Sequence, residues 1–169
     1  EDLCATLSRG LLDRHGYATT SEVEMRADYF LEMKTPSGRR TIESYHLLAR
    51  AVAHRGAAHL VRKSIGVEVI GMTACPCAQE TLRQFFAEKS KGARAGAMPA
   101  PLLSHNQRNV TSVQIDVPEK YPVEADDLIR LVESSQSAPT REILKRPDEG
   151  QLVLNAHLNP KFVEDVVRD

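Results

Sequence analysis

The chain has 169 residues, a length that supports one domain with its own hydrophobic core. Its formal net charge is −1, its aromatic content is 5% and it has no tryptophan, which argues against a basic, base-stacking surface for nucleic acid. Three cysteines are too few for a disulfide framework, and no apolar run approaches the ~20 residues that cross a bilayer. The acidic start does not resemble a signal peptide. We therefore expect a cytoplasmic protein with reduced thiols that binds neither nucleic acid nor a membrane.

The chain opens with a predicted helix. Residues 1–15 carry acidic side chains at the start and leucines at helical spacing, and Gly16 follows as a plausible helix end. Cys4 on this helix is expected in the core. The buried face is expected to consist of four leucines: Leu3, Leu7, Leu11 and Leu12.

Strand patterns follow. Residues 21–34 alternate between apolar and polar side chains, as a half-buried strand does, and residues 62–72 form a second such pattern that ends just before Cys75. Residues 41–54 contain apolar side chains at helical spacing, so their periodicity leaves helix and strand open. The turn over residues 35–40 has a basic tip, which we interpret as a solvated loop, with a phosphate clamp as the alternative.

The sequence after residue 77 predicts helices and one more strand. Residues 91–101 are rich in glycine, alanine and proline and predict a loop. Asn159 is a good N-cap and Pro160 suits the first position of the last helix. Helices are expected over residues 78–90, 122–133, 140–145 and 160–168, and a strand over 109–117. This order of elements indicates an α+β fold.

The densest group of metal-binding side-chain types lies between Gly71 and Arg108. Cys75 and Cys77 flank a proline that biases Cys75 toward an extended conformation. Thiolates and the imidazole of His105 suit zinc or ferrous iron. Because side chains one residue apart on an extended chain point to opposite sides, we expect one cysteine to be a ligand and the other to be packed nearby. The alternative is two ordinary thiols at a strand end.

These segments carry a family resemblance. Gly71-Met72-Thr73-Ala74-Cys75-Pro76-Cys77-Ala78-Gln79-Glu80 and Ser104-His105-Asn106-Gln107-Arg108 resemble the archaeal type of GTP cyclohydrolase, which opens methanopterin synthesis. They are similar, more distantly, to the bacterial type IB enzyme of folate synthesis. Further agreement comes from four later stretches: Ser134-Ser135, Leu144–Glu149, Asn155-Ala156-His157 and Asn159–Arg168.

The resemblance implies the tunnelling fold, an antiparallel sheet backed by helices, whose copies assemble into barrels with active sites at subunit interfaces. It favours a strand, in a long hairpin, for residues 41–54. It also makes residues 91–101 an insertion over the site, for which we hypothesise a lid, with a plain linker as the alternative. We expect residues 1–169 to form a single domain that is a portion of a longer chain, because the family's amino-terminal part and its later His-x-His-Asn segment are absent from this sequence.

The resemblance also implies a metal site. By matching motifs, the ligands are Cys75, His105 and Glu149, with Cys77 left open as an alternative to Cys75. The expected cofactor is Fe(II), with Zn(II) possible, since this donor set suits both ions almost equally. Three protein ligands leave positions open for water, as hydrolytic metal sites require.

Further roles follow from the same resemblance. Glu164 is expected to bind the guanine edge of GTP, since a carboxylate can accept two hydrogen bonds from N1–H and the 2-amino group. Asp165 beside it and His105 are expected in catalysis, and Arg108 in binding the substrate's phosphates. The alternatives are solvated helix acids for Glu164 and Asp165, surface charge for Arg108 and a core histidine for His157.

The leading hypothesis is a metal-dependent GTP cyclohydrolase that releases formate and forms 7,8-dihydroneopterin 2′,3′-cyclic phosphate. The first alternative is a bacterial-type enzyme that makes dihydroneopterin triphosphate. The second is a non-catalytic tunnelling-fold module that binds a purine or a metal, or serves in assembly. A tunnelling-fold reductase of deazapurines fits less well, because neither thiol lies in that family's setting.

Overall fold

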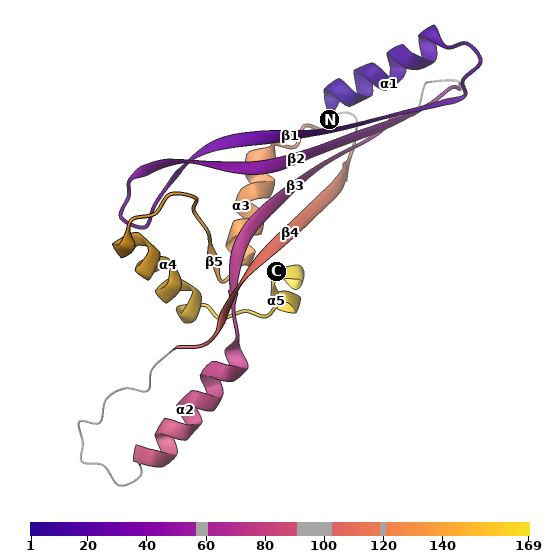
Figure 1. Ribbon diagram of the computed structural model, residues 1–169. Coiled ribbons are helices and arrows are strands. Elements are labelled where there is room, and N and C mark those ends of the chain that lie inside the picture. Colours follow the sequence, from indigo (N-terminus) through magenta and orange to yellow (C-terminus); the bar gives the residue numbers. More distant parts are fainter. Residues whose placement is uncertain (57–60, 91–102, 119–120) are drawn as a thin grey trace. The chain divides into compact units, whose positions relative to one another are not determined.

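The computed structural model describes residues 1–56, 61–90, 103–118 and 121–169. Its sheet has the strand order β1-β2-β3-β4, with the short β5 added beside β3, and the β2–β3 and β3–β5 pairs are antiparallel (Figure 1). The elements are α1 (Asp2–Arg14), β1 (Thr20–Lys34), β2 (Arg40–His54), β3 (Val61–Ala74), α2 (Pro76–Ser90), β4 (Asn106–Val117), α3 (Ala125–Ser135), β5 (Ala138–Pro139), α4 (Arg146–Leu158) and α5 (Val163–Arg168). The predicted α+β class with an antiparallel sheet is confirmed, including a strand over residues 41–54.

The chain divides into two compact units. Unit 1 contains residues 1–32, 42–69 and 111–131, and unit 2 contains residues 33–41, 70–110 and 132–169. The predicted lid over residues 91–101 lies outside the described residues. None of the described helices is long and apolar enough to cross a membrane.

The core of unit 1 joins α1 to β2 and β3. Cys4 and Leu12 of α1 are fully buried and belong to one cluster with Ala51, Ala53 and Val61. The prediction for Cys4 is confirmed.

The predicted leucine face of α1 is wrong at three of its four positions. Leu3, Leu7 and Leu11 are 57%, 46% and 40% exposed, respectively. The buried stripe instead consists of Cys4, Ala5, Ser8 and Leu12. Helical spacing fits both faces, and the small side chains of the second face allow the helix backbone to approach the sheet closely.

Close backbone approach also explains a glycine in unit 1. Residues of β2 and β3 pair in register from His46 opposite Glu68 to Ala53 opposite Val61. A Cβ atom at Gly66 of β3 would lie 2.8 Å from the carbonyl oxygen of Val113 in β4. A side chain at this position would therefore push β3 and β4 apart.

The short helix predicted over residues 140–145 is absent. Instead, α4 begins immediately after these residues, with a proline in its first turn. The buried residues of α4 are Asp148, Leu152, Ala156 and His157. Two of these four are polar, so the hydrophobic periodicity that reveals most helices is weak here.

The last helix begins later than predicted. α5 starts at Val163, whereas Asn159 ends α4, where its backbone N–H donates to the carbonyl of Asn155. Asp165 stabilises the start of α5, because its carboxylate accepts a hydrogen bond of 2.9 Å from the backbone N–H of Phe162. The buried residue of this helix is Val166.

Candidate functional site

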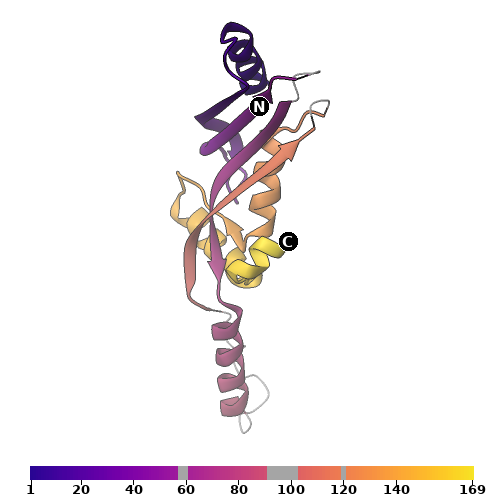
Figure 2. The same cartoon turned by 90° about the vertical axis from the view of Figure 1, so that its right-hand side faces the viewer.

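The Cys-Pro-Cys motif lies where β3 ends and α2 begins. Figure 2 shows that the strand leads directly into the helix. Cys75 sits between the two elements and is half-buried, Pro76 is the first residue of the helix, and Cys77 is exposed in the first helical turn. The expectation of an extended chain through both cysteines is therefore wrong. A proline fits the first turn of a helix because its missing N–H would have no helical partner there.

Cys75 lies beside His105, although 30 residues separate the two in the sequence. The backbone N–H of Cys75 donates a hydrogen bond of 3.1 Å to the carbonyl of His105. The hydroxyl of Ser104 donates a second bond, of 2.6 Å, to the carbonyl of Cys75. Two of the three predicted metal ligands are thus neighbours through their backbones, and the side chain of His105 is exposed.

Two buried side chains hold this junction: Gln79, for which the sequence analysis predicted no role of its own, and His157, whose interpretation as a core histidine is confirmed. Gln79 in the first turns of α2 is 2% exposed, and its Nε2 donates a 2.7 Å bond to the carbonyl of His157. His157 in α4 is 4% exposed, and its Nε2 lies 2.7 Å from the carbonyl of Ser104. Both residues stand inside or beside the motifs that carry the family resemblance, which was the available signal.

A cavity of about 370 Å³ in unit 2 contains two further predicted site residues, Arg108 and Glu149. The volume lies within the range of small-molecule sites. The cavity is lined by Met72, Arg108, Thr140, Arg141, Glu142, Leu144, Glu149, Leu152 and Val153.

The two arginines of this cavity differ in their partners. Arg141 makes two bonds, of 2.5 and 3.1 Å, to the carboxylate of Glu133, and both side chains are largely buried. The side chain of Arg108 has no hydrogen-bond or ion-pair partner among the described residues. The charge of Arg141 is therefore neutralised within the protein, whereas that of Arg108 is available to an anionic ligand.

Glu149 follows a carboxylate that is firmly held. Asp148 is 2% exposed and accepts bonds from the backbone N–H of Ser37 (2.8 Å) and from Nη2 of Arg39 (2.6 Å). The bond from Arg39 lowers the pKa of Asp148 from 3.8 to about 2. The start of α4 is thereby tied to the turn between β1 and β2, and Arg39 is committed to an ion pair rather than free to act as the phosphate clamp considered above.

The acid predicted to bind the substrate and the acid predicted to act in catalysis both lie on α5. Glu164 is exposed, and the half-buried Asp165 accepts bonds from the N–H of Phe162 and from Nη2 of Arg168, the latter 2.7 Å long. Neither acid is among the residues that line the cavity of unit 2. The contacts show that Asp165 stabilises the start of the helix. The guanine-binding role of Glu164 and the catalytic role of Asp165 stay predictions.

The three predicted metal ligands are not gathered into one group. Among the residues that the structure describes, no set of three or more histidine, cysteine, aspartate or glutamate side chains is arranged to hold a metal ion. Cys75 and His105 are joined through their backbones, and Glu149 lines the cavity. The donor types suit Fe(II) or Zn(II), and the ligand set stays a prediction.

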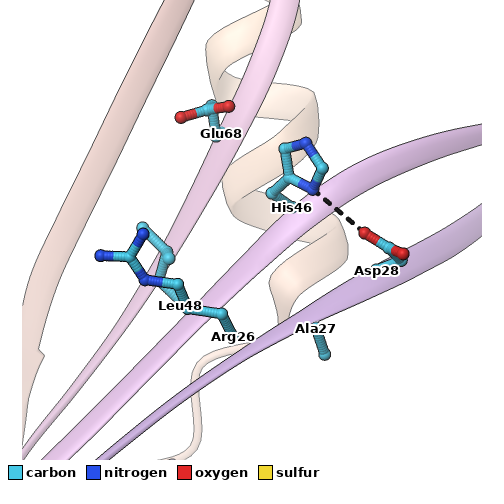
Figure 3. A pocket seen from close by; sticks show the side chains of 6 residues that line it. All are labelled: Arg26, Ala27, Asp28, His46, Leu48 and Glu68. Carbon is cyan, nitrogen blue, oxygen red and sulfur yellow. Dashed lines mark hydrogen bonds and ion pairs between the residues drawn. The ribbon is translucent and has the colours of Figure 1, made fainter.

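A second polar cavity, of about 350 Å³, lies over the sheet of unit 1 (Figure 3). Its wall includes Asp28 of β1, His46 of β2 and Glu68 of β3, which lie on three adjacent strands. Nδ1 of His46 lies 3.2 Å from Oδ1 of Asp28, and both side chains are more than half exposed. His46 and Asp28 therefore form a pair on the protein surface.

The fold and the site define a class: an α+β protein with an antiparallel sheet, in which a Cys-Pro-Cys strand end meets a Ser-His-Asn-Gln-Arg strand start. The family model described as type I GTP cyclohydrolase folE2 matches residues 1–169, and the chain belongs to this family.

Curated relatives agree with this assignment. The chain is 44% identical over 178 residues to the GTP cyclohydrolase MptA of Methanosphaera stadtmanae, covering 100% of this chain and 57% of the relative. It is 44% identical over 177 residues to the GTP cyclohydrolase MptA 2 of Methanocella arvoryzae, with coverages of 100% and 57%. It is 41% identical over 177 residues to the GTP cyclohydrolase MptA of Methanobrevibacter smithii, covering 100% of this chain and 57% of the relative. The resemblance inferred from the motifs is confirmed, and the chain spans little more than half the length of these relatives.

Proposed function

We propose that the full-length protein containing this chain is a cytoplasmic, metal-dependent GTP cyclohydrolase of the archaeal type. The proposed reaction opens the guanine ring of GTP, releases its C8 as formate and yields 7,8-dihydroneopterin 2′,3′-cyclic phosphate. The family match over residues 1–169 and relatives that are named GTP cyclohydrolase MptA support this activity.

The observation that carries the proposal is the backbone hydrogen bond of 3.1 Å from Cys75 to His105. It brings the backbones of Cys75 and His105, from two distant motifs, to one junction, and a metal site that uses both side chains requires such proximity. In this proposal the two side chains bind Fe(II) or Zn(II), and Glu149 supplies the third ligand. A bound divalent cation of this kind supplies Lewis acidity, which favours deprotonation of water at neutral pH.

The other proposed roles belong to protein side chains. Arg108 binds phosphate oxygens of GTP, because its guanidinium faces the cavity of unit 2 without a partner among the described residues. Glu164 accepts hydrogen bonds from the guanine edge, and its exposed position on α5 leaves the carboxylate accessible. Asp165 and His105 are proposed to move protons during ring opening.

We also propose that the chain adopts the tunnelling fold and self-associates, with active sites at subunit interfaces. The separation of Glu164 from the cavity lining supports this, since a second copy could bring a guanine-binding acid to a metal site that lacks one. The same arrangement would supply ligands from beyond a single chain.

The proposal is tested by turnover of GTP. The full-length protein is stripped of metal with a chelator, reconstituted anaerobically with Fe(II) or Zn(II), and the products are identified by mass spectrometry. Formate with a cyclic-phosphate pterin is the expected result. A triphosphate pterin would assign the bacterial-type reaction, and tight metal binding without any pterin would assign the non-catalytic module.

A further inference from the structure

We infer that His157 is a positioning residue that sets the geometry of the Cys75–His105 junction. The inference rests on the proposed function for its consequence, which is tighter metal binding, whereas the geometry stands by itself. His157 is 4% exposed in α4 and lies between the two segments that deliver the cysteine and the histidine.

His157 contacts both of these segments through different atoms. Its imidazole Nε2 lies 2.7 Å from the carbonyl oxygen of Ser104, the residue immediately before His105. Its own carbonyl accepts a 2.7 Å bond from Nε2 of Gln79, four residues after Cys75. One residue of α4 thus connects the start of α2 with the start of β4.

The contacts form one connected network of hydrogen bonds. Ser104, which His157 holds by its carbonyl, donates its hydroxyl to the carbonyl of Cys75 at 2.6 Å. The N–H of Cys75 in turn donates to the carbonyl of His105 at 3.1 Å. A displacement of Ser104 would therefore move both proposed ligands, because each is bonded to it or adjacent to it in the chain.

The contact with Ser104 requires a proton on Nε2 of His157. A carbonyl oxygen only accepts hydrogen bonds, so Nε2 must carry the proton and donate it. The other ring nitrogen, Nδ1, is buried and has no hydrogen-bond partner within the described part of the chain. A buried polar atom without a partner is uncommon and calls for an explanation. Here the explanation is that the imidazole is retained for the single bond from Nε2 to Ser104.

A side chain that orients metal ligands from outside the ligand set typically affects metal affinity or activity by about 10–100-fold. The same magnitude is expected for His157. Gln79 is expected to show a smaller effect, because it bonds the backbone of His157 rather than the segment that holds His105.

The test compares His157→Leu with His157→Gln. Leucine removes the donor, whereas glutamine keeps an N–H donor near the position of Nε2. The matched control is Leu12→Ala, which removes a fully buried side chain in unit 1 and lowers overall stability without touching the junction. Three quantities are measured on the full-length protein: the thermal midpoint, the hydrogen exchange of the Cys75 amide, and Zn(II) affinity by competition with a chromophoric chelator.

His157→Leu is expected to speed exchange of the Cys75 amide and to weaken Zn(II) binding about 10–100-fold. His157→Gln should keep both quantities within a few-fold of the unmodified protein, and Leu12→Ala should lower the thermal midpoint and change neither. Wild-type exchange and affinity in His157→Leu would overturn the inference. So would equal losses in Leu12→Ala, which would show a general effect of stability.

Two features keep the test decisive. If His157→Leu does not fold, His157→Asn replaces it, because the shorter side chain withdraws the donor from the carbonyl of Ser104 and should speed exchange at Cys75 in the same way. Exchange at Cys75 needs neither metal nor GTP. A failed cyclohydrolase assay combined with the expected exchange pattern would therefore refute the proposed function and leave the positioning role intact.

Discussion

Arg39 and Asp148 form an ion pair in unit 2, in which Nη2 of the guanidinium lies 2.6 Å from Oδ2 of a carboxylate that is 2% exposed. The pair connects the turn between β1 and β2 with the first turn of α4, although 109 residues separate its members. Because Glu149 follows Asp148 directly, this contact also fixes where the proposed metal ligand enters the cavity.

Asp148→Asn is expected to lower the thermal midpoint of unfolding, because the amide loses the charge that Arg39 and the Ser37 N–H stabilise. Calorimetry or circular dichroism measures the change. Asp127→Asn is the matched control, since Asp127 is an exposed acid in the first turn of α3. An equal fall in both variants would show that the ion pair contributes nothing specific.

The same carboxylate predicts a pH dependence of stability. The pKa of Asp148 is lowered from 3.8 in its free form to about 2 in the folded protein. The folded state therefore binds this proton less readily, and the stabilisation is present above about pH 4 and is lost as the pH falls toward 2. Urea unfolding between pH 5 and pH 2 should show the difference between the unmodified protein and Asp148→Asn shrinking across this window. A difference that stays constant to pH 2 would contradict the assignment.

Gly71→Ala is expected to destabilise the protein by about 1–3 kcal/mol, as overpacking of a filled interior does. A Cβ atom at Gly71 would overlap the carboxamide of Gln136, whose side chain is 1% exposed. Gly10→Ala is the control of opposite sign. Its Cβ meets open space on α1, so alanine should stabilise the helix by about 0.5–1 kcal/mol. Denaturant unfolding of both variants measures the two effects, and a neutral Gly71→Ala would show that Gln136 moves aside freely.

The two cavity arginines should separate binding from stability. Arg108→Gln is expected to raise the KM for GTP on the order of tenfold with an unchanged thermal midpoint, because it removes one charge-assisted contact to phosphate. Arg141→Gln should instead cost about 3 kcal/mol of stability, because it leaves the largely buried Glu133 without its cation. Steady-state kinetics and thermal unfolding of the full-length variants distinguish the two. The account of the cavity fails if Arg108→Gln unfolds early while its KM is unchanged.

The alternation of side chains predicted most of the sheet. It located β1 and β3, whereas the strand over residues 41–54 needed the family resemblance, since Tyr45, Leu48 and Val52 also fit helical spacing. The face of α1 could not be predicted from leucines alone, because burial there favours the small side chains of Cys4 and Ser8. α4 was missed for a related reason, as its buried stripe contains Asp148 and His157.

The sequence predicted some residues of the site but not the contacts that support them. The motifs named Cys75 and His105, and the structure joins their backbones. The contacts that support them join residues far apart in the sequence, such as Gln79 and His157. Local sequence patterns do not predict such pairs. Pro76 was interpreted as favouring an extended conformation at Cys75, although proline is also common in the first turn of a helix, which is where it lies.

The most direct test of the central claim compares Cys75→Ser with Cys77→Ser in the full-length protein after anaerobic loading with Fe(II). Metal content and formation of a pterin from GTP are measured on the same samples. Cys75 is held beside His105, whereas Cys77 is exposed in the first turn of α2. We therefore predict that Cys75→Ser loses both metal and turnover and that Cys77→Ser keeps both. Full metal content and turnover in Cys75→Ser would contradict a metal site built on the Cys75–His105 junction.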